Sequence, residues 1–373
     1  MAAIVGSLAA CASGPSPDTR LGGEAGQADN APLPAAISRG SSRWTPVRWA
    51  QLPGWGGDNN LHEAWNAWVK GCERPALGQD KLCAEVRPLV IASGAEKRAW
   101  MERRLQPYRV DEPDGNTPNG LLTGYYEPIL SASRLPTASY RTPLYAPPAG
   151  LARGQTWYTR QEIDSSPRAQ AELKGHAIAW LADPIDALVL QIQGSGRLNL
   201  TEADGRQHQV RLAFAGHNGQ PYRSVGRWLL DQRAIRDASW EGIRDWAARN
   251  PSRLNEMLWS NPRTVFFREE ALNEMDVQSG PKGAQGVPLT PGRSIAVDPK
   301  SIPYGTPVWL ATQGAALNVQ RLVMAQDTGG AIVGAVRADL FTGWGGWSDA
   351  AYQQAANLKQ PLQLWVLWPR SGG

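Results

Sequence analysis

From Gly120 onward the sequence is mostly short apolar runs that end at glycine or proline, and this pattern restricts the fold more than any other feature. Such runs, with turn residues at both ends, are typical of β-strands. One group reads LLTGYYEPIL, ALVLQIQGSGRL and QVRLAFAG. A second group follows Asn261 and reads TVFFRE, SIAVD, PVWLA, VQRLVMAQD, AVRADLF and LQLWVLW.

Helical spacing precedes the first group of runs and separates it from the second. Apolar residues recur every three or four positions, as on one face of a helix, in the segments 61–69, 95–105, 224–235, 238–250 and 251–260. The order is therefore helices, strands, helices, strands. This order predicts an α+β chain, mainly β, with at least two domains.

The composition narrows the class of function. The chain has 373 residues, 42% of them hydrophobic and 19% charged, which indicates a globular protein without the run of about 20 apolar residues that a membrane span needs. Its net charge is +4, but no long Lys/Arg run is present, which argues against nucleic-acid binding and suits a polyanionic partner such as cell wall. Seventeen tryptophans serve either the core or stacking on flat sugar faces.

The first residues, MAAIVGSLAACASGPSPDTR, resemble a bacterial lipoprotein signal without its basic start. In this interpretation residues 1–10 are a signal remnant, Cys11 carries the lipid, and residues 11–45 are a flexible tether. The anchor would hold the protein at a membrane by acyl chains, and Ala12 after the cysteine favours the periplasmic side of the outer membrane. A short disordered N-terminus is the alternative.

The remaining cysteines, Cys72 and Cys83, would form a disulfide in an exported chain, worth about 3 kcal/mol by chain entropy. Two buried free thiols are the alternative. Two cysteines and four scattered histidines make no metal-ligand cluster, and we expect neither a metal nor a cofactor.

A candidate general acid lies near the C-terminus, in RADLF. Strand alternation places Arg337, Asp339 and Phe341 on one face and Val336, Ala338 and Leu340 on the other. Burial beside Phe341 and the nearby tryptophans Trp344 and Trp347 would raise the pKa of Asp339, while Arg337 would oppose the shift. A carboxyl that stays protonated near neutral pH suits a general acid, although an Asp beside an Arg is more often an ion pair.

Other motifs supply candidate supporting and binding residues. Asp327 could cap a turn or support Asp339 if their strands pair, and Asp298, before Pro299, is expected to shape a turn. Two further groups have the uncharged donors and acceptors that suit sugars, or are a strand edge and a glycine turn: Thr123, Tyr125, Tyr126 with Glu127, and Gln193, Gly194, Ser195 with Arg197.

Taken together, the motifs GYYEP, QIQGSGR, AFAGHNGQPYRSVGRWL, GVPLTPGRSIAVDPKSIPYGTPVWL and AQDTGGAI…RADLFTGWG resemble the membrane-bound lytic transglycosylase A family. The resemblance runs from about Leu52 to the C-terminus. It implies a six-stranded double-psi β-barrel interrupted by a second β-rich domain, with a glycan-binding groove between them. The barrel domain would comprise residues 46–125 plus 270–373, and the insert residues 126–269.

The resemblance also implies roles for residues. It makes Asp339 the single general acid and base and Asp327 its support. Thr123, Tyr125, Tyr126, Glu127, Gln193, Gly194, Ser195 and Asp298 would bind substrate. The implied reaction cleaves the β-1,4 bond between N-acetylmuramic acid and N-acetylglucosamine and closes a 1,6-anhydro ring, with peptidoglycan strands and wall-remodelling proteins as partners. The alternatives are a β-1,4-glycan hydrolase and a non-catalytic, expansin-like wall-binding protein.

Overall fold

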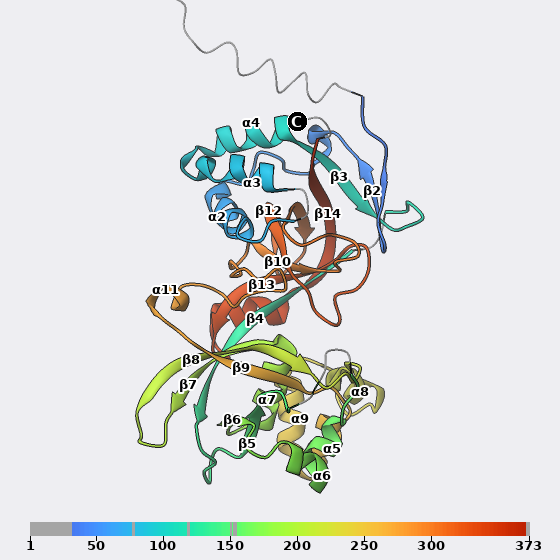
Figure 1. Ribbon diagram of the computed structural model, residues 1–373. Coiled ribbons are helices and arrows are strands. Elements are labelled where there is room, and N and C mark those ends of the chain that lie inside the picture. Colours follow the sequence, from blue (N-terminus) through green and yellow to red (C-terminus); the bar gives the residue numbers. More distant parts are fainter. Residues whose placement is uncertain (1–31, 77–78, 118–119, 150, 152–154, 371–373) are drawn as a thin grey trace, which may run out of the picture.

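The computed structural model describes residues 32–76, 79–117, 120–149, 151 and 155–370. These residues form two sheets, one above the other in Figure 1, and strand β4 (Gly120–Ser133) belongs to both. The predicted lipidation site, Cys11, lies outside the described residues. No helix within the described ranges is long and apolar enough to cross a membrane.

Six strands of the upper sheet close into a ring, which we call the barrel. From β4 the ring continues through β13, β10, β12, β11 and β14, and β14 pairs again with β4. The pairings β4–β13 and β10–β12 are parallel, and the others are antiparallel. The mainly β, α+β class is confirmed, and the ring agrees with a double-psi barrel. Its other strands are β10 (Ser294–Val297), β11 (Thr306–Gln313), β12 (Asn318–Asp327), β13 (Arg337–Gly345) and β14 (Lys359–Pro369).

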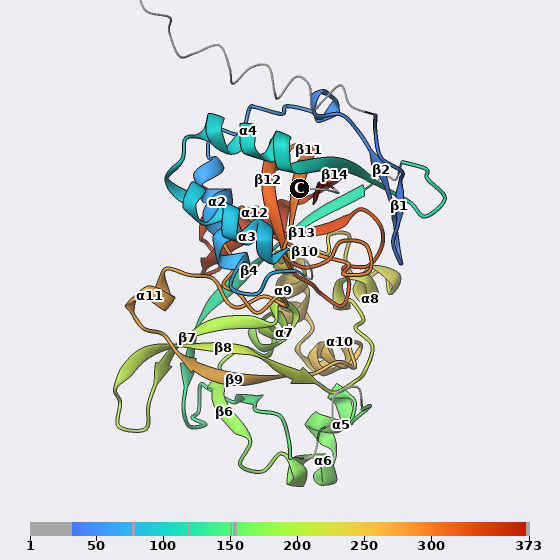
Figure 2. The same ribbon diagram turned by 45° about the horizontal axis from the view of Figure 1, so that its top comes forward.

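Further elements extend and cover the barrel. Strand β3 continues the sheet beyond β14, followed by β2 and β1. Figure 2 shows α2, α3 and α4 against one side of the barrel. The bounds are β1 (Ile37–Ser38), β2 (Arg43–Pro46), η1 (Trp49–Gln51), α2 (Leu61–Gly71), α3 (Asp80–Val86), η2 (Pro88–Ile91), α4 (Gly94–Arg104), β3 (Leu105–Asp111), α11 (Glu274–Val277) and α12 (Ala350–Asn357).

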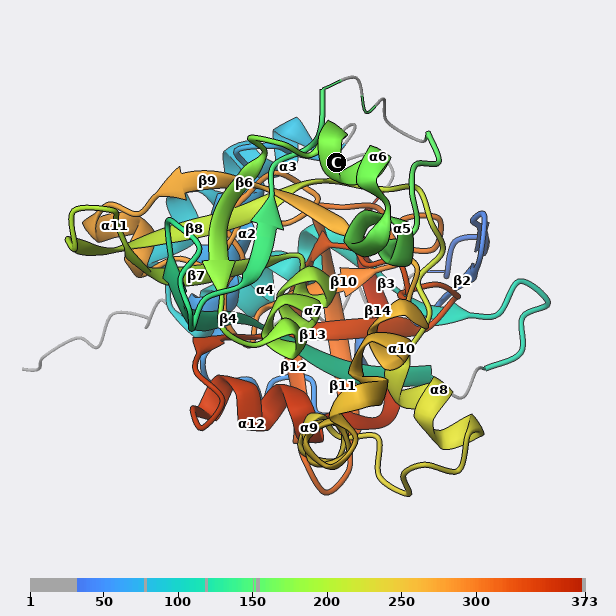
Figure 3. The ribbon, with the colours of Figure 1, turned by 90° about the horizontal axis from the view of Figure 1, so that it is seen from below.

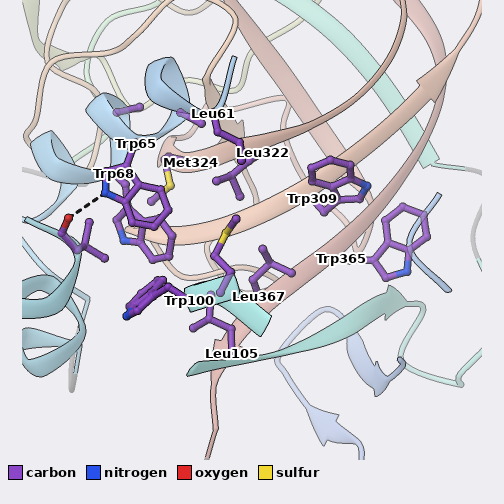
Figure 4. Close-up of a cluster of buried hydrophobic side chains, with 14 of the residues drawn as sticks. Leu61, Trp65, Trp68, Trp100, Leu105, Trp309, Leu322, Met324, Trp365 and Leu367 are labelled. Carbon is purple, nitrogen blue, oxygen red and sulfur yellow. Dashed lines mark hydrogen bonds between the residues drawn. The ribbon is translucent and has the colours of Figure 1, made fainter. Parts of the chain in front are cut away.

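Tryptophans fill the space between these helices and the barrel (Figure 4). Trp65 and Trp68 come from α2 and Trp100 from α4, and their ring centroids lie 5.2–5.7 Å apart. Trp309 of β11 and Trp365 of β14 belong to the same buried cluster. A disulfide joins Cys72, at the end of α2, to Cys83 of α3. Much of the tryptophan content therefore serves the core and not a sugar-binding surface.

The lower sheet has the order β5, β6, β4, β7, β8, β9. Figure 3, a view from below, shows α7 beside β4, and the two elements are in contact. The bounds are β5 (Thr142–Tyr145), α5 (Arg160–Ser165), α6 (Pro167–Glu172), β6 (Ala177–Leu181), α7 (Pro184–Gln193), β7 (Ser195–Thr201), β8 (Gln207–His217), α8 (Val225–Asp231), α9 (Trp240–Arg249), η3 (Pro251–Arg253), α10 (Leu254–Trp259) and β9 (Val265–Ala271).

One predicted strand is wrong: most of ALVLQIQGSGRL is helix α7, and only its end is strand β7. Asp183 caps the helix by accepting a hydrogen bond from the Ile185 N–H at 2.8 Å, and Pro184 occupies the first turn. Gly194 ends it in the left-handed conformation, at φ 81°. An apolar run this short fits a strand or a helix equally, and the caps at its two ends decide for the helix.

Candidate active site

The two candidate catalytic aspartates lie in one row across the barrel. Ala296 of β10 pairs with Asp327 on one side and with Asp339 on the other. Residues directly opposite each other in a sheet point to the same face, so both carboxylates share a face, with backbones about 10 Å apart at two strand spacings. Strands β12 and β13 therefore do not pair directly, as β10 lies between them. Thr123 of β4 pairs with Asp339 and continues the row.

Strand alternation sets the direction of Asp339, as predicted. Val336, Ala338 and Leu340 are part of the buried barrel core. Asp339 is half-buried on the opposite face, with Arg337 two residues before it. Trp344 and Trp347 have other contacts: Arg197 lies 4.3 Å from the Trp344 ring, and Trp347 donates to Asp186 at 3.1 Å.

The surroundings of Asp339 favour its protonated form. Burial raises the pKa of this carboxyl, and the nearby charge of Asp327 adds to the shift. Two groups oppose it: the Thr123 hydroxyl, which donates to Asp339 Oδ1 at 2.5 Å, and the charge of Arg337. The net effect is a raised pKa, which is the property that a general acid needs at neutral pH.

Asp327 is held in place by donors on both of its oxygens. The Tyr125 hydroxyl donates to Oδ2 at 2.8 Å, and the Ala284 N–H donates to Oδ1 at 2.9 Å. Burial raises the pKa of Asp327, while Tyr125 and the backbone donors oppose the shift. The pKa of Tyr125 is raised by burial and by the charge of Asp327, so the phenol stays a neutral donor. Tyr125 also packs on Phe341 at 5.4 Å, which ties the two aspartate strands together.

Asp298 anchors a loop. Its carboxylate accepts hydrogen bonds from Ser41 Oγ, from the Lys300 N–H and from the Gly334 N–H at 2.9–3.0 Å. Burial would raise the pKa of Asp298, but these three donors outweigh it and the pKa is lowered. The side chain is 5% exposed, and its Gly334 bond fixes the segment between β12 and β13. We therefore propose a structural role for Asp298 instead of substrate binding.

Glu127 is also placed differently from a sugar-binding residue. It is completely buried, and it accepts from Arg197 Nε at 2.8 Å and from Arg211 Nε at 2.6 Å. A carboxylate with no exposed surface cannot contact a glycan or serve as a second acid in this state. We call Glu127, Arg197 and Arg211 the Glu127 clamp, and we propose that it holds the junction between the barrel and the lower sheet.

The remaining predicted binding residues are buried or half-buried. Tyr126 is 2% exposed and packs on Tyr352, so its ring is closed to a ligand. Gln193 is half-buried, and its Oε1 accepts from the Tyr126 N–H at 3.1 Å. Gly194 is the helix cap described above, and Ser195 is 8% exposed. The structure therefore brings Thr123, Tyr125, Asp327 and Asp339 together, and places the QIQGS segment at the junction.

Two contacts of this site were not expected from the sequence. Arg337 Nη2 donates to Thr123 Oγ1 at 2.8 Å, so it reaches Asp339 through a hydroxyl and not as a direct ion pair. The backbone of Ala284, from the segment between α11 and β10, fixes Asp327. The i, i+2 spacing of Arg337 and Asp339 was a usable signal for the first contact. No side-chain pattern marks the second, because the donor is a main-chain group.

Known protein families and solved structures resemble this chain in sequence and in fold. The sequence matches the family described as "MltA specific insert domain" over residues 121–268 and the one described as "3D domain" over residues 293–368. The structure of the lytic transglycosylase LtgG of Burkholderia pseudomallei is 42% identical, with a TM-score of 0.58, and the match covers 91% of this chain and 98% of that one. The chain belongs to the MltA family.

Two other MltA relatives show how far the similarity extends. The monoclinic crystal structure of MltA from Neisseria gonorrhoeae is 28% identical with a TM-score of 0.72, covering 92% of this chain and 97% of that one. The membrane-bound lytic murein transglycosylase A of Vibrio cholerae is 29% identical over 260 residues, or 67% of this chain. The chain matches 65% of that relative's length, slightly less than two thirds.

Proposed function

We propose that this MltA-family chain is a peptidoglycan lytic transglycosylase with Asp339 as its single general acid and base. The observation that carries the proposal is the position of Asp339: half-buried, with a raised pKa, on the face of the barrel that points away from the core. The names of the relatives described above, lytic transglycosylase and lytic murein transglycosylase A, support the substrate and the reaction class.

In the proposed reaction Asp339 gives its proton to the glycosidic oxygen between N-acetylmuramic acid and N-acetylglucosamine, and that bond breaks. An oxocarbenium-like centre forms at C1 of the muramoyl residue. Its C6 hydroxyl attacks C1, and the ionised Asp339 takes the hydroxyl proton. The product is a 1,6-anhydro ring, and the carboxyl returns to its starting state.

The structure offers little to the hydrolase alternative, which requires a second free carboxylate to activate water. Both oxygens of Asp327 already accept hydrogen bonds, and Glu127 is enclosed by two arginines. We therefore propose that Asp327 supports the site by holding Tyr125 and the segment around Ala284, between α11 and β10, in place. An expansin-like binding protein would have no use for a carboxyl with a raised pKa beside Thr123.

Mass spectrometry of the products released from peptidoglycan sacculi tests the proposal. Products about one water (roughly 18 Da) lighter than reducing muropeptides are expected, because the muramoyl hydroxyl replaces water as the nucleophile. Asp339→Asn should release none while still binding sacculi. Reducing products would establish a hydrolase instead, and binding without any product from the parent would establish a wall-binding protein.

The location and the domain boundaries are also proposals. The sequence pattern around Cys11 supports a lipid anchor on the periplasmic side of the outer membrane, and the name of the Vibrio cholerae relative includes "membrane-bound". Cys11→Ser should move the expressed protein from the membrane to the soluble fraction, and an unchanged distribution would exclude the anchor. We also propose a barrel domain of residues 46–125 plus 270–373 with an insert of 126–269, since the shared strand β4 contains the boundary.

A further inference from the structure

Asp339 lies at the end of a three-residue hydrogen-bonded chain. Arg337 Nη2 donates to Thr123 Oγ1 at 2.8 Å, and Thr123 Oγ1 donates to Asp339 Oδ1 at 2.5 Å. Register and alternation build this chain: Thr123 pairs directly with Asp339, and Arg337 precedes Asp339 by two residues on the same face of β13.

The chemistry of the three groups fixes the direction of each bond when Asp339 is ionised. A guanidinium can only donate, whereas a threonine hydroxyl has a single hydrogen and two acceptor sites. The Thr123 oxygen must therefore accept from Arg337. An ionised carboxylate can only accept, so the one hydroxyl hydrogen points to Asp339 Oδ1. An oxygen that accepts this bond is the poorer site for the acid proton.

We propose that Arg337 and Thr123 assign the catalytic proton to Oδ2 of Asp339, so that one oxygen acts first as the acid and then as the base. This inference rests on the proposed function. Oδ2 releases its proton to the glycosidic oxygen, and the charge left on the carboxylate is stabilised at Oδ1 by Thr123. The C6 hydroxyl then returns a proton to Oδ2 as its oxygen bonds to C1, and no other co-reactant is needed.

Arg337 acts through the hydroxyl and is a positioning residue. Its Nη1 donates to the carbonyls of Ala338 at 2.5 Å and Leu121 at 3.4 Å. These two hydrogen bonds fix the orientation of the guanidinium. Among the described residues it makes no ion pair with a carboxylate within 4.0 Å. Thr123 is likewise a positioning residue in this proposal and not a sugar ligand.

Other ionisable groups around this chain come from each neighbouring strand. Asp327 faces Asp339 across β10 and raises its pKa. Tyr125, on β4, donates its hydroxyl hydrogen to Asp327, and Lys359 of β14 pairs directly with Thr123. Within the described ranges Thr123 is the side chain that donates to Asp339, which leaves Oδ2 for the substrate.

The test is a carbon-13 NMR titration of the Asp339 carboxyl in the ligand-free protein, with the signal identified by its loss in Asp339→Asn. The hydroxyl stabilises the ionised form, so its removal in the isosteric Thr123→Val should raise the pKa of Asp339 by about one unit. Thr123→Ser keeps the hydroxyl and should titrate like the parent. Arg337→Met should also raise this pKa, and Arg337→Lys, a donor-only cation, should shift it less.

A double variant separates the effect that Arg337 exerts through the Thr123 hydroxyl, which we call the relay, from the direct effect of its charge. The charge of Arg337 acts on Asp339 in either background. If Arg337 also acts through the hydroxyl, Arg337→Met should raise the pKa of Asp339 less in the Thr123→Val background than in the parent. Additive shifts would overturn the relay, as would an unchanged pKa in Thr123→Val. Should Thr123→Val fail to fold, Thr123→Ala replaces it, with Thr123→Ser again as the control.

Activity gives a second and independent readout. Thr123→Val should move the alkaline limb of kcat to higher pH by the same amount and leave KM unchanged, because the acid stays protonated longer. A raised KM with an unmoved limb would make Thr123 a sugar ligand and refute the proposal. The titration needs no substrate. A parent without anhydro products therefore refutes the proposed function, whereas an unshifted titration refutes the relay.

Discussion

The Glu127 clamp allows a sharp prediction of stability. Glu127, Arg197 and Arg211 have side-chain exposures of 0%, 1% and 6%, so water does not screen their interaction. Replacing Glu127 by Gln preserves the shape and removes the negative charge that faces both guanidinium groups. Breaking a buried pair in this way costs about 3–5 kcal/mol, because an uncompensated buried charge remains.

Other acceptors reduce this cost without removing it. Arg197 donates to the carbonyls of Val277 and Ser279 at 2.8 and 2.9 Å, and Arg211 donates to Ser279 at 2.7 Å. These bonds remain in the variant, so we expect the lower end of the range, about 3 kcal/mol. Burial lowers the pKa of Arg197, Glu127 opposes this shift, and the nearby charge of Arg211 adds a smaller lowering effect. Without the Glu127 charge, the repulsion between the two arginines is no longer offset.

Urea unfolding followed by tryptophan fluorescence measures the loss. The matched control is Glu269→Gln, which removes a carboxylate from Arg134, a pair with 27% and 32% exposure. That control should cost less than about 1 kcal/mol because water screens it. If Glu127→Gln costs no more than the control, burial does not govern the energy of the clamp, and its assignment to the junction fails.

Three further perturbations have defined outcomes. Gly196→Ala should lower the melting temperature, because its Cβ would lie 2.3 Å from Leu190 Cδ1 and 3.1 Å from the Pro128 carbonyl, whereas Gly216→Ala, with open space, should not. Reducing the disulfide between Cys72 and Cys83 should cost about 3 kcal/mol in urea unfolding, and equal unfolding midpoints with and without reductant would contradict this. Asp339→Asn should raise the melting temperature at pH 8. The pKa of Asp339 is raised in the folded state, so the parent protein loses stability as pH rises above the unfolded pKa of about 3.9. The variant avoids this loss, and its higher melting temperature should disappear at pH 3.

Local patterns predicted the barrel strands and the direction of Asp339 well. Alternation along this strand needs only neighbouring residues. The buried face and the half-buried Arg337 and Asp339 came out as expected, whereas Phe341 is completely buried. The two helices at 61–71 and 94–104 followed equally from their spacing. In each case the information lies within about ten residues of the element itself.

Features that depend on distant pairing could not be predicted in this way. Glu127 looked like a strand-edge residue, and its burial depends on Arg197 and Arg211, which are 70 and 84 positions away. The row that joins Asp327 to Asp339 depends on β10 lying between their strands, and a short apolar strand carries no mark of its neighbours. The error at helix α7 is of another kind, because its caps, Asp183 and Gly194, are local in the sequence. These caps decide an apolar run that by itself fits a strand or a helix.

The sharing of β4 between the two sheets orders the events of folding. Its second part, Ile129 to Ser133, pairs with β7, about seventy residues further along the chain. Its first part, Gly120 to Pro128, pairs with β13 and β14, which are synthesised more than two hundred positions later. Until then one stretch of the strand has an open edge that other chains can join. Contacts between residues so far apart in the sequence also form slowly. The lower sheet can therefore form before β14 completes the barrel. The step most exposed to aggregation is therefore the one that completes the site around Asp339.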